Sequence, residues 1–131
     1  MTDADVREVQ ATLDAFVEGL RTLDWPSMRE AFAADATAFF PFDEVPRRVE
    51  GIAAIEDAFR AFFATRAGAS PLDVRPRDVS THLAGDAAIV TFHLDRNASV
   101  GRRTLVLRRA AGQWRIAHLH ASTAGGATAS P

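Results

Sequence analysis

The hydrophobic residues of the chain change their spacing near Pro71, and this change most restricts the possible folds. Before Pro71 they recur at intervals of three and four, which is typical of helices with one apolar face. After Pro71 they tend to alternate with polar residues, which is typical of strands with one buried face. The order predicts an α+β domain, in which helices pack on one face of a curved antiparallel sheet.

Three helices are expected in the first half of the chain. The first covers about residues 3–22, the second follows Asp24, whose side chain can cap it, and the third follows Gly51. A short buried strand over 36–40 is expected between the second and third helices. Gly68 and Pro71 then end the third helix.

The second half predicts a meander of strands. A strand over 72–83 is interrupted at Pro76, a second covers 87–95, and a hairpin over 101–122 turns near Ala111 and Gly112. Residues 123–131 are small and polar, and we expect them to be disordered. No repeat, linker or second domain is evident, so residues 1–131 are assigned to one domain.

The composition excludes several classes of function. A net charge of −2 argues against nucleic acid or an anionic membrane surface as a partner. The absence of cysteine excludes disulfides and thiolate sites, and the absence of tyrosine excludes a phenol as an acid or oxyanion donor. The acidic start lacks the pattern of a secretion signal, and no apolar run approaches the roughly 20 residues that cross a bilayer. We therefore expect a cytoplasmic protein.

The last strand has an unusual mixture of side chains. Strict alternation would place an aromatic, an aliphatic, two imidazoles and a hydroxyl on one face, namely Trp114, Ile116, His118, His120 and Ser122. The opposite face would carry smaller and mostly apolar side chains, namely Arg115, Ala117, Leu119 and Ala121. Either set could line a pocket while the other packs between subunits, and sequence parity does not choose between them.

Several short segments of the sequence resemble those of the nuclear transport factor 2-like superfamily. They are Leu23-Asp24-Trp25, the run from Phe32 to Thr37, and Gly51 with Ile52 and Ile55. The ending Gly-x-Trp-Arg-Ile-x-His-x-His-x-Ser, from Gly112 to Ser122, resembles the SnoaL-like branch and the association domain of calmodulin-dependent kinases. The resemblance extends from about Val6 to Ser122, nearly the whole chain.

The resemblance implies a cone-shaped, strongly curved antiparallel sheet wrapped around three N-terminal helices, a cystatin-like roll that opens to an apolar pocket. Members of the superfamily include ketosteroid isomerases, polyketide cyclases, dehydratases and epoxide hydrolases, and also domains that only bind ligands or assemble. Most are homodimers or larger assemblies. Because one fold serves all of these functions, the resemblance alone does not identify an activity.

The isomerase motif is not retained. In that enzyme an aspartate directly precedes the proline that ends the first strand, and here Phe40 precedes Pro41. The tyrosine that donates to the substrate oxyanion has no counterpart, because the chain contains no tyrosine. Ketosteroid isomerase activity is therefore not expected.

Asp43, His118 and His120 are the candidate catalytic residues. Asp43 follows Phe42 in the loop beyond Pro41, where an aromatic wall would favour a general base. Imidazoles titrate near pH 6.5 and can carry a proton in either direction. The alternatives are a solvated loop carboxylate paired with arginine, and imidazoles that bridge strands or subunits. A metal would need a third ligand, so neither a metal nor another cofactor is predicted.

The candidate ligand-binding residues are aromatic side chains and polar groups expected near the pocket: Trp25, Phe39, Phe40, Phe59, Phe63, His93, Arg103 and Trp114. An inward guanidinium at Arg103 would suit a carboxylate, whereas the alternative is an ordinary surface arginine. The expected partner is a small apolar or aromatic molecule that carries a carboxylate or carbonyl, together with a second copy of the chain that forms a homodimer through the sheets.

Two classes of function follow from these observations. One is a cofactor-free isomerase, cyclase or dehydratase that transfers protons in a pocket with little water. The other is a dimeric ligand-binding or assembly domain without turnover.

Overall fold

The computed structural model describes residues 3–96 and 98–125, without the side chain of Arg96. Within these residues the elements follow one another as α1 (Asp3–Thr22), α2 (Trp25–Arg29), β1 (Phe32–Phe39), β2 (Val49–Glu50), α3 (Ile52–Thr65), β3 (Arg77–Ala84), β4 (Ala87–Arg96), β5 (Ser99–Ala110) and β6 (Gln113–Gly125). The prediction of an α+β domain is confirmed.

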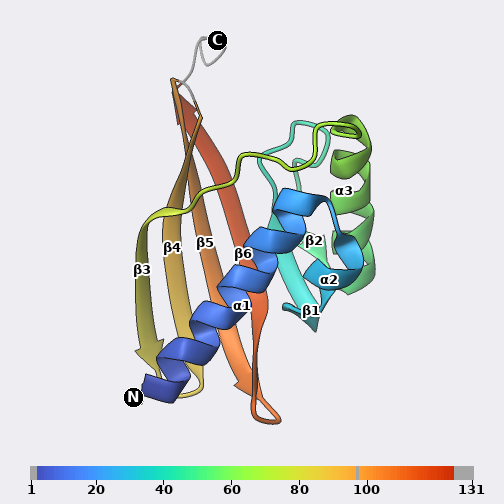
Figure 1. Ribbon diagram of the computed structural model, residues 1–131. Helices are drawn as coiled ribbons and strands as arrows, with labels where there is room; N and C mark the ends of the chain where they lie inside the picture. Colours follow the sequence, from blue (N-terminus) through green and yellow to red (C-terminus); the bar gives the residue numbers. More distant parts are fainter. Residues whose placement is uncertain (1–2, 97, 126–131) are drawn as a thin grey trace.

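The described strands form one curved, unclosed sheet in the order β2-β1-β6-β5-β4-β3, and α1 crosses one of its faces (Figure 1). All neighbouring strands are antiparallel except β1 and β6, which are parallel. The expectation of a wholly antiparallel sheet was therefore wrong at one pairing. The physical reason is the path of the chain, because β1 precedes the other strands in the sequence but lies beside the last strand, β6, with the same direction.

The helices begin and end close to where the sequence places them. The apolar spacing of α1 buries Val9, Leu13 and Phe16 against the sheet. Asp24 caps α2, since its carboxylate accepts hydrogen bonds from the backbone N–H of Ser27 at 3.2 Å and from the Ser27 hydroxyl at 2.6 Å. Both features are local, which explains why they could be predicted.

The ends of the predicted strands differ from those observed. The segment around Leu72 forms no strand, and its backbone N–H instead donates to the carbonyl of Arg21 at 2.7 Å. This bond holds the segment at the end of α1, and β3 begins only at Arg77. At the other end, β6 continues to Gly125, into the segment for which we predicted disorder. Residues 126–131 lie outside the described residues.

A bulge divides β6 into two halves with different faces. Leu107 pairs with Ile116 and the preceding residue, Val106, pairs with His118, so Ala117 is an extra residue in β6. One extra residue reverses the side-chain alternation along the strand. The expectation that five alternate residues share one face, from Trp114 to Ser122, was therefore wrong.

The burial of the side chains follows this reversal. Before the bulge, Trp114 and Ile116 are buried, and beyond it Leu119 and Ala121 are buried instead. His120 is consequently exposed, on the side of the sheet away from the core. Neither of the two parities considered from the sequence holds over the whole strand.

The packing of α1 on α2 depends on a glycine. A Cβ atom added at Gly19 would lie 2.6 Å from Cβ of Met28, which is fully buried. Real Cβ atoms do not approach so closely. The added atom would also lie 3.0 Å from Cα and 3.1 Å from the backbone nitrogen of Met28, so a change of side-chain rotamer could not relieve the contact. The two helices can adopt this arrangement only because position 19 has no side chain.

Gly19→Ala is expected to lower the free energy of unfolding. Helix propensity alone predicts the opposite, a gain of about 1 kcal/mol, whereas overpacking costs about 1–3 kcal/mol. Ala15→Gly is the control, because Ala15 is exposed in the same helix and its replacement should cost about 1 kcal/mol. Urea denaturation of the two variants measures both effects. A Gly19→Ala protein more stable than wild type would contradict the close approach.

Candidate functional site

A funnel-shaped hollow lies between the helices and the concave face of the sheet, toward the turn that joins β4 to β5. Its inner lobe has a volume of about 70 Å³ and is lined by Phe16, Leu20, Phe40, Pro41, Phe42, Phe59, Phe62, Arg103, Leu119 and Ala121. A wider outer lobe of about 280 Å³ adjoins it. The two lobes share the lining residues Leu20, Pro41, Phe42, Phe62 and Arg103. We call the two lobes together the funnel.

The inner lobe has an aromatic wall. The ring of Phe42 stacks on Phe40 with 5.5 Å between centroids and on Phe62 with 5.1 Å. Phe40 in turn meets Phe59 edge to face at 5.1 Å. These rings come from the loop that follows β1 and from α3. Their mutual packing holds the wall in one arrangement and makes the lobe strongly apolar.

Arg103 is the charged side chain in this apolar lining. It lies on β5 two residues before Leu105, which is fully buried, so alternation directs it to the concave face. Its Nη1 donates to the carbonyl oxygens of Arg102 and Ser122, both at 3.0 Å. These two bonds hold the half-buried guanidinium at the junction of the lobes.

The charge of Arg103 has no counter-ion among the described residues. Desolvation by burial lowers the pKa of its guanidinium, which nonetheless stays protonated at neutral pH. The outer lobe does contain carboxylates, but Asp73 is paired with Arg75 at 2.7 Å and Asp95 is exposed. No described carboxylate comes within ion-pair distance of Arg103, so an anion in the funnel would meet an uncompensated positive charge.

Of the predicted ligand-binding residues, Phe40, Phe59 and Arg103 line the inner lobe. The others lie elsewhere. Trp25 is buried in the core, stacked on Phe59 at 5.7 Å, and Trp114 is buried beneath the guanidinium of Arg109.

The other three candidates lie near the surface. Phe63 packs on the ring of Phe59 without lining either lobe. Phe39 lies on the face of the sheet opposite the core, and His93 on β4 lies 3.5 Å from a carboxylate oxygen of Asp78.

The candidate catalytic residues are not brought together around the funnel. Asp43 is exposed in the loop beyond Pro41 and lines neither lobe, although its neighbour Phe42 lines both. His118 and His120 lie on the side of the sheet away from the core, which we call the uncovered face. Their proposed roles in proton transfer therefore stay predictions.

His118 and His120 form a small cluster with residues of β1 on that face. His118 Nδ1 is hydrogen-bonded to the hydroxyl of Thr37 at 2.7 Å. The ring of Phe39 lies between the imidazoles, with centroids 5.8 Å from His118 and 5.3 Å from His120. The parallel register of β1 and β6 creates these contacts, because it pairs Thr37 with His118 and Phe39 with His120.

The environment of His118 disfavours its protonated form. Desolvation by burial lowers its pKa, and the nearby charges of His120 and Arg48 act in the same direction, while a hydrogen bond with Thr37 acts against them. Among the described residues no group of three or more His, Cys, Asp and Glu side chains is arranged to hold a metal ion. The absence of a metal and of other cofactors stays a prediction.

Sequence reasoning missed several residues of the funnel. Phe16 and Leu20 lie on the apolar stripe of α1, which signals burial but does not distinguish the funnel from the core. Leu119 and Ala121 belonged to the alternative face of the last strand. Only knowledge of the bulge at Ala117 separates this pair from Arg115, which shares their parity but does not line the funnel.

Acidification is expected to destabilise the protein in part through His118. Because its pKa is lower in the folded state, the unfolded chain binds the proton first, and stability falls as the pH drops below about 6.5. His118→Gln should reduce the loss of unfolding free energy between about pH 7.5 and about pH 5.5. Urea denaturation at both pH values measures this loss of unfolding free energy. His82→Gln is the control, because His82 is exposed on β3. An unchanged pH dependence in His118→Gln would contradict the assignment.

Comparison with solved structures finds the same fold in proteins of distant sequence. An NTF2-like protein of unknown function from Pseudomonas putida has a TM-score of 0.82 and 23% identity, over 93% of this chain and 88% of that one. A protein of unknown function with a cystatin-like fold from Nostoc punctiforme has a TM-score of 0.78 and 17% identity, over 98% and 96% of the two chains. A proposed dehydratase of the NTF2-like family from Streptomyces avermitilis has a TM-score of 0.76 and 19% identity, over 95% and 99%.

These identities are low enough that the likeness concerns the fold alone. No curated protein sequence matches the chain. Within the described residues, no helix has both the length and the apolar character needed to span a membrane. The model of the SnoaL-like domain matches residues 9–125, which include every described strand of the sheet, α2, α3 and the larger part of α1. The chain therefore belongs to the SnoaL-like domain family, within the NTF2-like fold.

Proposed function

We propose that the protein binds a small apolar or aromatic carboxylate in the funnel. The observation that carries this proposal is the guanidinium of Arg103, half-buried in an aromatic lining without a carboxylate partner among the described residues. A charge held in this way is unfavourable for the free protein. A ligand carboxylate would compensate it, and the interaction would gain strength from the poor access of water.

The geometry of Arg103 leaves donors available for a ligand. Within the described residues its hydrogen bonds run from Nη1 to two main-chain carbonyls. The N–H groups of Nε and Nη2 remain, and they form the side of the guanidinium fork that binds both oxygens of a carboxylate. Nη1 would then act as an anchor while the other two nitrogens hold the ligand.

The size of the inner lobe limits the apolar part of the ligand. A volume of about 70 Å³ suits a short alkyl group or a single small ring, and is far below the roughly 300 Å³ at which typical drug-sized pockets begin. The outer lobe of about 280 Å³ could take a further substituent. The inner lobe is too small for a fused polycyclic ketone.

Turnover is not part of this proposal. Among the described residues of the inner lobe none is histidine, aspartate or glutamate, so no side chain there is suited to accept a proton at neutral pH. The dehydratase proposed for the Streptomyces avermitilis protein belongs to that protein. A catalytic role for Asp43, His118 and His120 would require an approach of substrate from outside the funnel.

We further propose that the uncovered face of the sheet pairs with a second copy of the chain. Two rows of mostly uncharged side chains cross this face in register: Ile89, Val106, His118 and Thr37, and then Thr91, Thr104, His120 and Phe39. Ile89 is 49% exposed, which is a large fraction for an isoleucine on an ordered strand. Burial of these rows in a two-fold contact would remove apolar area from water.

Arg103→Gln is expected to abolish carboxylate binding. Wild-type protein should show a rise in melting temperature with benzoate or butyrate, and none with benzyl alcohol or butanol, because only the acids compensate the charge. Loss of the guanidinium should lower the affinity of the protein for these acids by at least about tenfold. Arg102→Gln is the matched control, since Arg102 is the adjacent residue of β5 and is exposed on the opposite face. An unchanged response in Arg103→Gln would remove the basis of the proposal.

The dimer is tested by placing a charge on the uncovered face. Sedimentation of the wild type should give a mass near twice the 14.2 kDa of one chain. Thr104→Glu should shift it to the monomer, because Thr104 lies between Thr91 and His120 in the centre of the rows. Ala61→Glu adds the same charge at an exposed site on α3 and should have no effect. A monomeric wild type at micromolar concentration would refute the dimer.

A further inference from the structure

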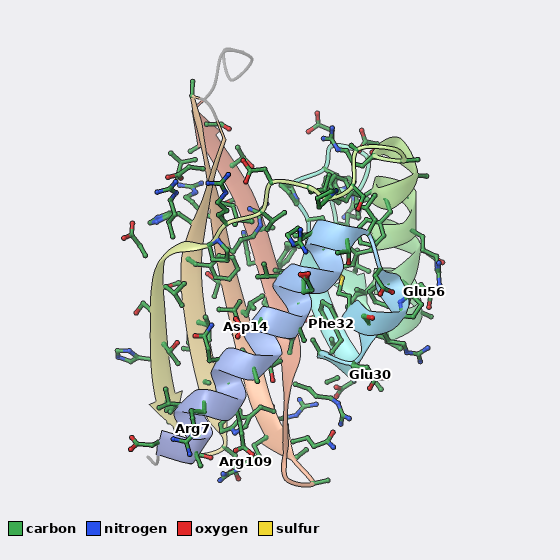
Figure 2. The ribbon with its side chains drawn as sticks, in the orientation of Figure 1. Arg7, Asp14, Glu30, Phe32, Glu56 and Arg109 are labelled. Carbon is green, nitrogen blue, oxygen red and sulfur yellow. The ribbon has the colours of Figure 1, made fainter. Side chains whose placement is uncertain are left out.

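A second hollow lies toward the opposite end of β5 and β6, near the turn that joins them. It has a volume of about 440 Å³ and is lined by Arg29, Glu30, Phe32, Ala33, Ala34, Asp35, Ile52, Arg108, Ala110, Gln113 and Arg115. Two of these lining residues, Glu30 and Phe32, lie where the chain passes from α2 into β1 (Figure 2). None of its lining residues lines the funnel. We call it the basal hollow.

The basal hollow follows from an irregular pairing of β1. Phe32 pairs with Ile116 and Thr37 pairs with His118, so residues 33–36 of β1 stand against the single residue Ala117 of β6. The surplus residues of β1 bend away from the neighbouring strand. Ala33, Ala34 and Asp35 therefore line one side of the hollow, and Ile52 at the start of α3 adds a further apolar group.

Two arginines lie side by side in the lining of this hollow. Arg108 of β5 pairs directly with Arg115 of β6. Both alternate with buried neighbours, Leu107 and Ile116, so both project to the side of the sheet away from the core. Like charges directly opposite one another in a sheet are destabilising unless an anion lies near them.

The described residues provide only part of the anionic charge that this pair needs. Asp35 Oδ1 accepts a hydrogen bond from Arg108 Nη2 at 2.8 Å, but Arg115 has no ion-pair partner within the described part of the chain. Arg29 adds a third guanidinium at the rim, and its charge acts on Glu56 outside the hollow. Against these three arginines the described lining holds two carboxylates, those of Glu30 and Asp35.

We propose that the basal hollow is a second anion site, which binds a phosphate group between Arg115 and Arg108. Guanidinium forks match the oxygens of a phosphate, and two of them side by side suit a doubly charged group better than a single carboxylate. The volume exceeds what an isolated phosphate requires. The apolar side formed by Ala33, Ala34 and Ile52 would therefore contact the organic part of a phosphomonoester.

The site is tested by titrating the intact protein with inorganic phosphate and with phenyl phosphate, followed by calorimetry and by amide chemical shifts. Arg115→Gln should weaken binding by about tenfold through loss of charge-assisted hydrogen bonds. Asp35→Asn should strengthen it several-fold, because it removes the carboxylate that competes for Arg108. Opposite effects of two neighbouring residues would not arise from a general loss of structure.

Arg77→Gln is the control, since it removes the same charge from the exposed edge strand β3. Arg103→Gln should leave the binding of inorganic phosphate unchanged, so that this proposal and the carboxylate funnel can fail separately. In the Arg103→Gln protein, tighter binding of phenyl phosphate than of inorganic phosphate would identify a phosphomonoester as the ligand, and equal binding would identify free phosphate. The proposal is overturned if neither probe saturates, if Arg115→Gln behaves like Arg77→Gln, if Asp35→Asn weakens binding, or if Arg115→Gln changes only the sedimenting mass.

Discussion

The extra residue at Ala117 decides how the last strand is used. Without it, strict alternation from Trp114 and Ile116 would direct His118 and His120 into the apolar interior, where imidazoles without partners are costly. With it, Leu119 and Ala121 take the interior positions and the histidines turn outward. One backbone irregularity thus allows a single strand to contribute to the core, to the funnel and to the uncovered face.

The pairing of β1 with β6 is also irregular at Ala117, with a different consequence. Because residues 33–36 stand against a single residue of β6, β1 regains its register only at Thr37. From there the parallel pairing is regular, and it places Phe39 and Thr37 beside the two imidazoles. Before Thr37, residues 33–36 of β1 are not paired regularly with β6, and three of them line the basal hollow. The irregular pairing of β1 with β6 therefore affects both the contacts of the histidines on the uncovered face and the basal hollow at the other end of these strands.

The sequence predicted correctly the features that depend on residues close to one another along the chain. The spacing of Val9, Leu13 and Phe16 predicted α1, and Asp24 predicted the start of α2. An inward Arg103 was one of two alternatives that the sequence left open, and in the structure this side chain lines the inner lobe, while its role in binding a ligand stays a prediction.

What the sequence could not supply was the register between distant strands. The bulge at Ala117 is defined by its partners on β5 and β1, so no local pattern marks it, and the row from Trp114 to Ser122 was consequently misassigned. The roles of the aromatic residues were hidden for a related reason. Trp25 and Phe59 have the same character in the sequence and even stack on each other, yet only Phe59 reaches the funnel.

The position of Arg103 is difficult to explain by stability alone. An apolar residue of similar length would pack against Phe42 and Phe62 without an uncompensated charge, and such replacements of buried charges are often neutral or stabilising. The two carbonyl contacts of Nη1 orient the guanidinium but do not neutralise it. A bound carboxylate would do so, and by linkage it would stabilise the folded state in proportion to its affinity. On this argument the free protein retains an electrostatic cost at Arg103, and binding of the ligand removes it.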